Sequence, residues 1–242
     1  MLFNRGSHGD YDMSATEKTF NTIGTVSVNY ARHPVAPYGT IGRQHNFRCT
    51  NAFYSKLETC FAELWRVCPN GQPQAVVSAG AYVNKPGYHG MGRAFDLDAI
   101  FWPGRTFVTN RFEDYPDFYL GVEAILRKHF GTVLTYNYNH AHRDHFHIDD
   151  GTSVGFRTTR SITLFVQGVC YYMLGKRFRG NVDGDYGSAT RAVLEEACNE
   201  LHVPTLLTTQ ANWNQFLDAV ARFVFRDERR TRPNDYDCTR HH

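Results

Sequence analysis

The sequence predicts an α+β fold: a small antiparallel sheet flanked by helices, followed by a small all-α C-terminal module. Apolar runs of strand length alternate with helical patterns between residues 50 and 150, and only helical patterns follow them. The chain has 242 residues, 42% hydrophobic and 21% charged, as in ordinary globular proteins with a real core. Four segments are expected: a disordered N-terminus (1–20), a main domain (21–152), a helical module (160–225) and a loose tail (226–242).

The main domain is expected to begin with an extended segment over 21–48, because prolines and glycines interrupt this polar stretch. Apolar residues recur at helical spacing over 51–67 and 115–130, which predicts two amphipathic helices. Four apolar runs between these segments and after them are expected to form the antiparallel sheet: 74–82, 93–102, 131–135 and 145–148.

The C-terminal module is expected to be separate from the main domain. Residues 151–160 carry glycine, serine and threonine without an apolar period, which indicates a linker. Three helices are expected beyond it, at 164–174, 188–202 and 210–225. Taken alone, this pattern indicates no more than a small helical unit.

Charge and hydropathy argue against two classes of partner. The formal net charge is only +2, and lysine and arginine are scattered, so we expect no binding to nucleic acid. No run of 18 apolar residues occurs, so we expect no membrane span. The N-terminal residues lack the apolar region of a secretory signal, so the export route is not visible in this chain.

The six cysteines include no C-x-x-C pair, which disfavours a structural zinc site made of four cysteines. Cys60 and Cys68 are expected to share a helical segment, about 12 Å apart along its axis, which is too far for a bridge. Cys170 and Cys198 are a better candidate pair, on two helices of the C-terminal module. The alternative is that most of the cysteines are buried thiols.

Histidines and aspartates gather in two segments, 89–96 and 142–147, which together predict a zinc site. Strand alternation places Asp96 on the open face of its strand, and the glycines of the preceding loop allow His89 to reach the same ion. Further on, His145 and His147 share one strand face. Neutral imidazoles with a carboxylate favour zinc over magnesium or calcium. Chance His-x-His pairs are common in a chain with 12 histidines, so the evidence is the co-occurrence of both segments.

Asp144 does not fit simple alternation, because it should point away from His147. It can approach the site only if the strand begins at His145 and the backbone bends before it. Under that condition Asp144 is the expected general base for a zinc-activated water, whose pKa falls to about 7. A protonated His145 would stabilise the oxyanion, and His142 is a candidate second imidazole in this role.

At these residues the sequence resembles a known family. The motifs H-x-x-G-x-A-x-D and D-H-x-H are similar to those of zinc D-alanyl-D-alanine peptidases and murein endopeptidases. Within that group, the segment from Phe130 to Asp149 resembles the bacterial extensin-like C-terminal domain family, and the resemblance spans about residues 45–150. It implies a zinc peptidase-like fold with zinc on His89, Asp96 and His147, Asp144 as base, His145 as its helper and His142 as a further active-site histidine.

Two departures from the family pattern concern the substrate. Gly87 stands where the family commonly has serine, two residues before the first histidine. The arginine that often holds the substrate carboxylate is missing from the region 79–85, where Lys85 or Arg93 is the candidate substitute. Because a carboxypeptidase must recognise a free C-terminus, the missing anchor favours an endopeptidase that cleaves stem peptides or cross-links of peptidoglycan.

The C-terminal segment from Leu164 to Val193 resembles the three-helix peptidoglycan-binding domain, so peptidoglycan is the expected partner. The two resemblances imply a bacterial cell-wall hydrolase acting in the periplasm or cell wall of the producing or a target cell. An amidase with the same metal and a non-catalytic wall-binding protein are the alternatives. A housekeeping enzyme, a phage lysin and an injected toxin all remain open, and a toxin would have an immunity protein as a partner.

Overall fold

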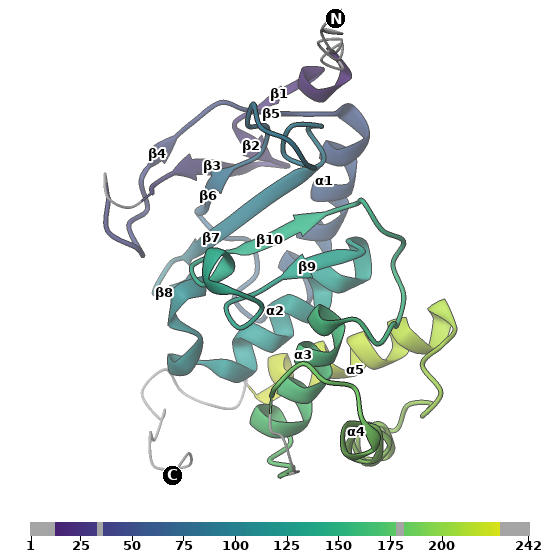
Figure 1. Cartoon of the computed structure of the whole chain (residues 1–242). Coiled ribbons are helices and arrows are strands. Elements are labelled where there is room, and N and C mark those ends of the chain that lie inside the picture. Colours follow the sequence, from purple (N-terminus) through teal and green to yellow (C-terminus); the bar gives the residue numbers. More distant parts are fainter. Residues whose placement is uncertain (1–12, 33–35, 178–181, 228–242) are drawn as a thin grey trace, which may run out of the picture.

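The computed structural model describes residues 13–32, 36–177 and 182–227, and at its centre lies one mixed sheet (Figure 1). The α+β class predicted from the sequence is confirmed. Across the sheet the strands follow the order β2 (Thr22–Ile23), β3 (Val26–Tyr30), β6 (Ala75–Gly80), β7 (Ala94–Trp102), β10 (Phe146–Asp149) and β9 (Thr132–Leu134), with β4 (Arg43–Gln44) beside β3 and β8 (Arg105–Val108) beside β7.

Strand pairing in this sheet is antiparallel, as predicted, except between β3 and β6, which run parallel with Val28 opposite Val76. The segment 21–48 was expected to be merely extended, yet it supplies β3. The reason is local: Val26 and Val28 alternate with polar residues and bury their side chains in the core.

The N-terminal residues form regular structure from residue 13 onwards. A 3₁₀ turn, η1 (Met13–Thr16), leads into β1 (Lys18–Phe20), which pairs with β5 (Phe47–Cys49) in a separate two-stranded sheet. The predicted disorder over 1–20 is therefore wrong for residues 13–20, because this segment buries the ring of Phe20 against that of Phe47. Residues 1–12 lie outside the described part of the chain.

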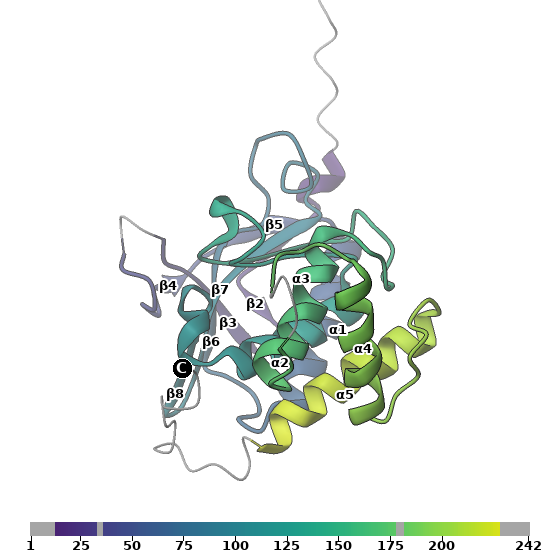
Figure 2. The ribbon, with the colours of Figure 1, turned by 60° about the horizontal axis from the view of Figure 1, so that its bottom comes forward.

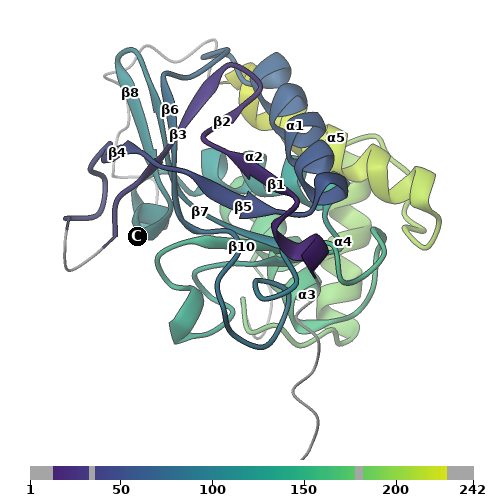
Figure 3. The same cartoon turned by 90° about the horizontal axis from the view of Figure 1, so that it is seen from above.

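Two long helices cover one side of the sheet (Figure 3). Helix α1 (Asn51–Val67) has the predicted bounds and begins where Thr50 Oγ1 accepts a hydrogen bond from the Phe53 amide at 3.1 Å. Helix α2 (Pro116–His129) begins with a proline, which suits a first helical turn. Both helices share a hydrophobic core with Phe95 of β7. Two further 3₁₀ turns are η2 (Thr109–Asp114) and η3 (His140–His142).

The C-terminal helices join this same core. They are α3 (Arg160–Gly168), the π-helical turn η4 (Val169–Met173), α4 (Ser188–Glu200) and α5 (Gln210–Asp227). Helix α5 lies along α2 (Figure 2), where the rings of Phe225 and Phe118 pack edge to face with centroids 5.6 Å apart. The apolar faces of these helices complete the cover of α2, and the predicted division into two units at 151–160 stays a prediction.

The cysteines of the described residues are buried, and Cys49, Cys60, Cys170 and Cys198 are free thiols. The predicted bridge between Cys170 and Cys198 is not formed, and Cys170 Sγ lies 3.7 Å from the Val193 carbonyl oxygen. Burial raises the pKa of the Cys170 thiol to about 12, so this residue packs as a small apolar side chain. Cys238 lies outside the described residues.

Within the described ranges, no helix combines the length and apolar character needed to cross a membrane. The predicted tail begins inside α5, which runs to Asp227, so the last helix is longer than expected. The remainder of that tail, residues 228–242, is outside the described structure.

Candidate metal centre

Strands β7 and β10 bring two of the predicted ligands face to face. His147 lies directly opposite Asp96 in the antiparallel register, and paired residues project from the same face of a sheet. The Asp96 Oδ1 atom is 3.0 Å from His147 Nδ1. Phe95 and Ile148, each next to one of these residues, point into the core on the opposite face. The apolar neighbours thus fix which way both polar side chains point.

The third predicted ligand, His89, comes from the loop between β6 and β7. Gly92 has a φ of +64°, and a Cβ atom there would lie 2.2 Å from the Ala15 carbonyl oxygen. A Cβ at Gly90 would lie 1.9 Å from the Lys85 carbonyl oxygen, so the loop can fold back only with glycine at both positions. His89 is buried at 4% exposure, and its Nδ1 donates a hydrogen bond to the Ala81 carbonyl at 2.5 Å.

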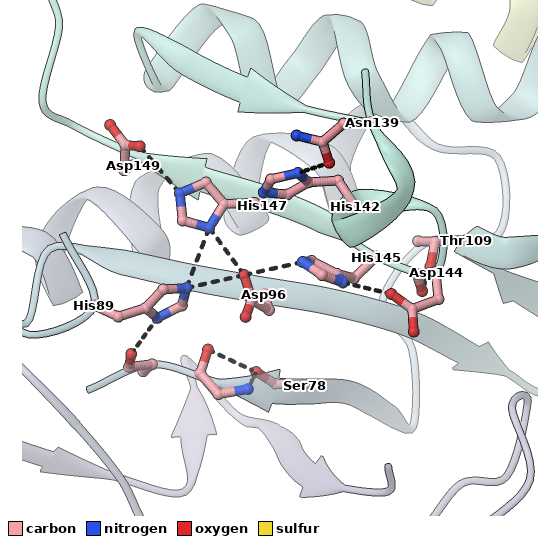
Figure 4. Close-up of polar contacts among 12 residues, drawn as sticks. Ser78, His89, Asp96, Thr109, Asn139, His142, Asp144, His145, His147 and Asp149 are labelled. Atoms are coloured by element: carbon pink, nitrogen blue, oxygen red, sulfur yellow. Dashed lines mark hydrogen bonds and ion pairs between the residues drawn. The ribbon is translucent and has the colours of Figure 1, made fainter. Parts of the chain in front are cut away.

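The three side chains converge on one point (Figure 4). His89 Nε2 lies 3.1 Å from Asp96 Oδ1 and 3.2 Å from His147 Nδ1. A tetrahedral ion with ligands at about 2.0–2.1 Å separates its ligand atoms by about 3.3 Å, close to these spacings. The set His89, Asp96 and His147 could therefore hold a metal ion.

His89 and His147 each form a hydrogen bond through the ring nitrogen that faces away from the common point, and these two bonds also fit a metal site. The Nδ1 proton of His89 is directed to Ala81, which leaves Nε2 as the nitrogen with a lone pair. His147 has the opposite arrangement: its Nε2 donates to Asp149 Oδ2 at 3.1 Å, so Nδ1 faces the centre. Both imidazoles thus present to the common point the nitrogen that a metal requires.

The electrostatics of the cluster favour a bound cation. Burial alone would raise the pKa of Asp96, but its contacts with His147 and His89 and the nearby charge of His145 hold the pKa well below its usual range. Burial alone would lower the pKa of His147, but hydrogen bonds to Asp149 and Asp96 raise it to about 9. Asp96 is therefore a carboxylate, and positive charge at this point is stabilised by two acidic side chains.

Asp144 and His145 form a pair beside the three candidate ligands. The chain turns at Asp144 and bends at His145, and β10 begins only at Phe146, so the backbone bend required for Asp144 to approach is present. His145 Nδ1 donates to Asp144 Oδ1 at 2.7 Å, and His145 Nε2 lies 3.6 Å from Asp96 Oδ1. The ring of His145 therefore lies between Asp144 and Asp96 (Figure 4).

The carboxylate of Asp144 has a second partner, Tyr38, whose hydroxyl donates to Oδ2. Hydrogen bonding from His145 lowers the pKa of Asp144 to about 2, and the Tyr38 hydroxyl contributes to the same shift. Burial, together with the nearby Asp144 charge, raises the pKa of Tyr38 to about 12. Asp144 is therefore ionised and fixed in place at neutral pH.

His142 lies in η3 above the site, where its Nδ1 donates to Asn139 Oδ1 at 2.7 Å. Its ring centroid is 5.4 Å from that of His145 and 5.6 Å from that of His147. Burial, followed by the charges of these two histidines, lowers the pKa of His142 to about 4. The predicted site thus includes His142 as a neutral imidazole at its edge.

Residues 78–160 match the model of the family described as extensin-like protein C-terminus. This extensin-like segment covers about one third of the chain, from β6 to the first residue of α3. It contains the three candidate ligands together with Asp144 and His145. The match supports the extensin-like family for this part of the protein. The curated proteins and the solved structures contain no significant match to the chain.

The extensin-like segment also contains a buried carboxyl that has no assigned role in the sequence prediction. Asp98 lies two residues beyond Asp96 on β7 and is 5% exposed. Burial, followed by the charges of Asp96 and Asp144, raises the pKa of Asp98 to about 8. The Thr109 hydroxyl lies 2.9 Å from the Asp98 carbonyl oxygen and 2.6 Å from that of Asp144, which ties β7 to the turn before β10.

The two predicted substrate-binding residues lie in or beside the His89 loop. Lys85 is exposed, and its predicted role stays a prediction. Arg93 Nε donates to Asp150 Oδ1 at 2.7 Å and its Nη2 donates to the Asp150 carbonyl at 3.0 Å, and its predicted role likewise stays a prediction. Its guanidinium also lies 5.6 Å from the centroid of the Tyr88 ring. Arg93 therefore joins Asp150 and Tyr88, two residues of the extensin-like segment.

Sequence reasoning missed three side chains in or beside the predicted site. Asp149 had a usable signal, because it follows His147 by two residues and so shares its strand face. Asp98 had the same signal relative to Asp96. Tyr38 had none, because 106 residues separate it from Asp144 and its own segment lacks a regular pattern.

Proposed function

We propose that this chain is a zinc-dependent peptidoglycan peptidase that hydrolyses peptide bonds in stem peptides or cross-links. The observation that carries the proposal is the convergence of His89, Asp96 and His147 within 3.2 Å of one another, beside the Asp144–His145 pair. Three protein ligands of the His/Asp type are typical of catalytic zinc sites, whereas structural sites have four and are rich in cysteine. The resemblance of both motifs to zinc peptidases supports the choice of substrate.

Zinc bound to these ligands supplies Lewis acidity, which polarises a carbonyl group and lowers the pKa of a coordinated water. The chain supplies the proton transfer. Asp144 already accepts hydrogen bonds on both oxygens, from His145 and Tyr38, whereas His145 Nε2 is directed toward Asp96. We therefore propose that His145 Nε2 accepts the proton as the general base. Asp144 then holds the His145 ring in place and stabilises its protonated form.

This assignment exchanges the roles that the sequence alone suggests, in which Asp144 is the base and His145 its helper. Once protonated, His145 can also donate from Nε2 to the developing oxyanion, which keeps its predicted stabilising role. His142 is neutral and lies near both rings, so it is suited to donate or accept a hydrogen bond at the edge of the site.

We favour endopeptidase over carboxypeptidase activity. Recognition of a free C-terminus requires a cation for the terminal carboxylate, and Arg93 is already bound to Asp150. Cleavage within a cross-link does not need such an anchor. Because the proposed substrate is peptidoglycan, the proposed place of action is the periplasm or cell wall of a bacterium.

The proposal is tested by digestion of purified sacculi with zinc-loaded protein, followed by mass spectrometry of the released muropeptides. We expect products cut within the peptide. Products in which the whole stem peptide is released from the sugar would indicate the amidase alternative. Binding to sacculi without products, in protein that retains no zinc, would indicate the non-catalytic alternative.

Two variants make the test specific. His147→Ala should lose both zinc and products while its far-UV circular dichroism spectrum stays unchanged. His202→Asn is the matched control, because His202 is exposed and has a φ of +56°, a conformation that asparagine tolerates. The mechanism is refuted if zinc-free wild-type protein digests sacculi as fast as the zinc form.

A further inference from the structure

We propose that Asp149 is the positioning residue of the metal centre, forming a carboxylate–histidine–metal unit with His147. The proposal rests on the metal site of the proposed function and adds to it a residue outside the three ligands. Such outer carboxylates fix the tautomer and the orientation of a ligating imidazole and strengthen it as a donor.

The geometry of Asp149 matches this role. Its Oδ2 atom accepts the hydrogen bond from His147 Nε2 at 3.1 Å, on the side of the ring away from Asp96 (Figure 4). Its Oδ1 atom accepts from the Gly151 amide at 2.9 Å. Asp149 is only 3% exposed, so water does not compete for these contacts. Both of its oxygens are thus engaged, one with His147 and one with the backbone.

The segment that carries Asp149 is held by its neighbours. Asp150 binds Arg93 through its side chain and its carbonyl group, and its other carboxylate oxygen lies 3.1 Å from Lys56 Nζ in α1. Gly151 packs so closely on Tyr88 that a Cβ atom would lie 2.0 Å from the ring. These contacts join the end of β10 to α1 and to the His89 loop, so they fix the position of the Asp149 carboxylate.

This arrangement gives Arg93 a structural explanation. Arg93 binds Asp150, the residue next to Asp149, in place of a substrate carboxylate. Because Tyr88 lies directly before His89, the same set of contacts supports two ligands at once. Without Asp149, the His147 ring could rotate or carry its proton on Nδ1, the nitrogen that must face the metal.

The test measures zinc affinity by competition with a chromogenic chelator for wild type, Asp149→Asn and Asp149→Ala. We expect zinc dissociation constants about 10- to 100-fold higher in both variants. Asp114→Asn is the control for loss of one negative charge, because Asp114 is exposed at the end of η2, and it should bind zinc like wild type. Thermal unfolding of the zinc-free proteins shows whether the isosteric Asn variant remains folded.

A second readout separates positioning from general stability. In ¹⁵N-labelled wild type with zinc, the His147 Nε2–H signal should be protected and shifted by its hydrogen bond, and this signal should be lost in Asp149→Ala. If wild type binds no zinc, the proposed function fails and this proposal with it. If wild type binds zinc and both Asp149 variants bind it equally well, only the role of Asp149 is overturned.

Discussion

His145 and Asp144 are consecutive residues whose side chains are hydrogen-bonded, with His145 Nδ1 2.7 Å from Asp144 Oδ1. In a regular strand, consecutive side chains point to opposite faces. The pair exists because the chain turns here before β10 begins at Phe146. The same bend leaves His145 Nε2 facing Asp96, at 3.6 Å from its Oδ1 atom.

This pair predicts that hydrolysis and metal binding can be separated by mutation. Asp144→Asn and His145→Gln should each lower kcat by about 10²- to 10⁴-fold, the usual contribution of a positioned acid or base. Zinc content should be unchanged, because neither side chain belongs to the three ligands. The double variant should lose little more than either single one, since the two residues act as a unit.

The measurement is kcat on a purified cross-linked muropeptide, with zinc determined on the same samples. Tyr38→Phe is a milder variant for comparison, because it removes one hydrogen bond to Asp144 and leaves His145 in place. Its loss of kcat should be smaller than that of Asp144→Asn. Wild-type kcat in Asp144→Asn would remove Asp144 from the proposed mechanism.

Arg93 and Lys85 are predicted to differ, although the sequence proposes the same role for both. Arg93→Gln should weaken zinc binding and leave KM unchanged, because Arg93 anchors Asp150 next to Asp149. Its effect on folding should be about 0.2–1 kcal/mol, since the Arg93 side chain is 40% exposed. Lys85→Gln should raise KM if the exposed lysine contacts substrate. A raised KM with normal zinc affinity in Arg93→Gln would restore the substrate-anchor interpretation.

The C-terminal helices are predicted to be necessary for folding of the sheet domain. Phe225 in α5 is 3% exposed and packs on Phe118, and Gly121 of α2 leaves room for it, since a Cβ there would lie 3.2 Å from its ring. Phe225→Ala should therefore lower the free energy of unfolding by about 3–5 kcal/mol.

Phe223→Ala is the matched control in the same helix, because the Phe223 side chain is 36% exposed, and it should cost much less in urea titrations. A truncated chain that ends at residue 159 should not fold, because α2 would lose its cover. If that fragment unfolds cooperatively and binds zinc, the two parts are independent modules after all.

Much of this fold could be predicted because the local patterns are strong. The helix expected at 51–67 has the observed bounds, since its apolar residues recur at helical spacing along this range. The site could be predicted because strand alternation fixes the face of Asp96, and small residues mark the loop that carries His89. In both cases the information lies within a few residues.

The errors have a common physical cause. The pattern of an amphipathic helix predicts which of its faces is buried but not which element covers that face. The contact of Phe225 with Phe118 was therefore not predictable. A short strand likewise does not reveal its partner, so the parallel pairing of β3 with β6 was not predictable. The ion pair of Arg93 with Asp150 was not predictable either, because 57 residues separate the two.

A cluster of charges at the junction of three helices predicts a loss of stability in acid. Glu63 of α1 accepts hydrogen bonds from Lys128 and His129 of α2, and Lys128 also binds Asp218 of α5 at 2.6 Å. Burial alone would raise the pKa of Glu63, but the bonds from Lys128 and His129 lower it. The pKa of Glu63 is lower in the folded than in the unfolded protein. Its carboxylate therefore stabilises the fold at pH values above the unfolded-state pKa of about 4.3. This contribution is lost as the pH falls through the folded pKa.

Glu63→Gln should therefore lower the free energy of unfolding at pH 7 by about 1.5–3 kcal/mol, the usual contribution of hydrogen bonds to a charged group. The difference from wild type should shrink as the pH falls below about 4, because the wild-type carboxyl then becomes neutral as well. Urea titrations of both proteins across this range measure it, with Glu113→Gln, at an exposed position in η2, as the control. A gap between wild type and Glu63→Gln that stays constant down to about pH 3 would show that the Glu63 side chain stabilises the helices through packing and not through its charge.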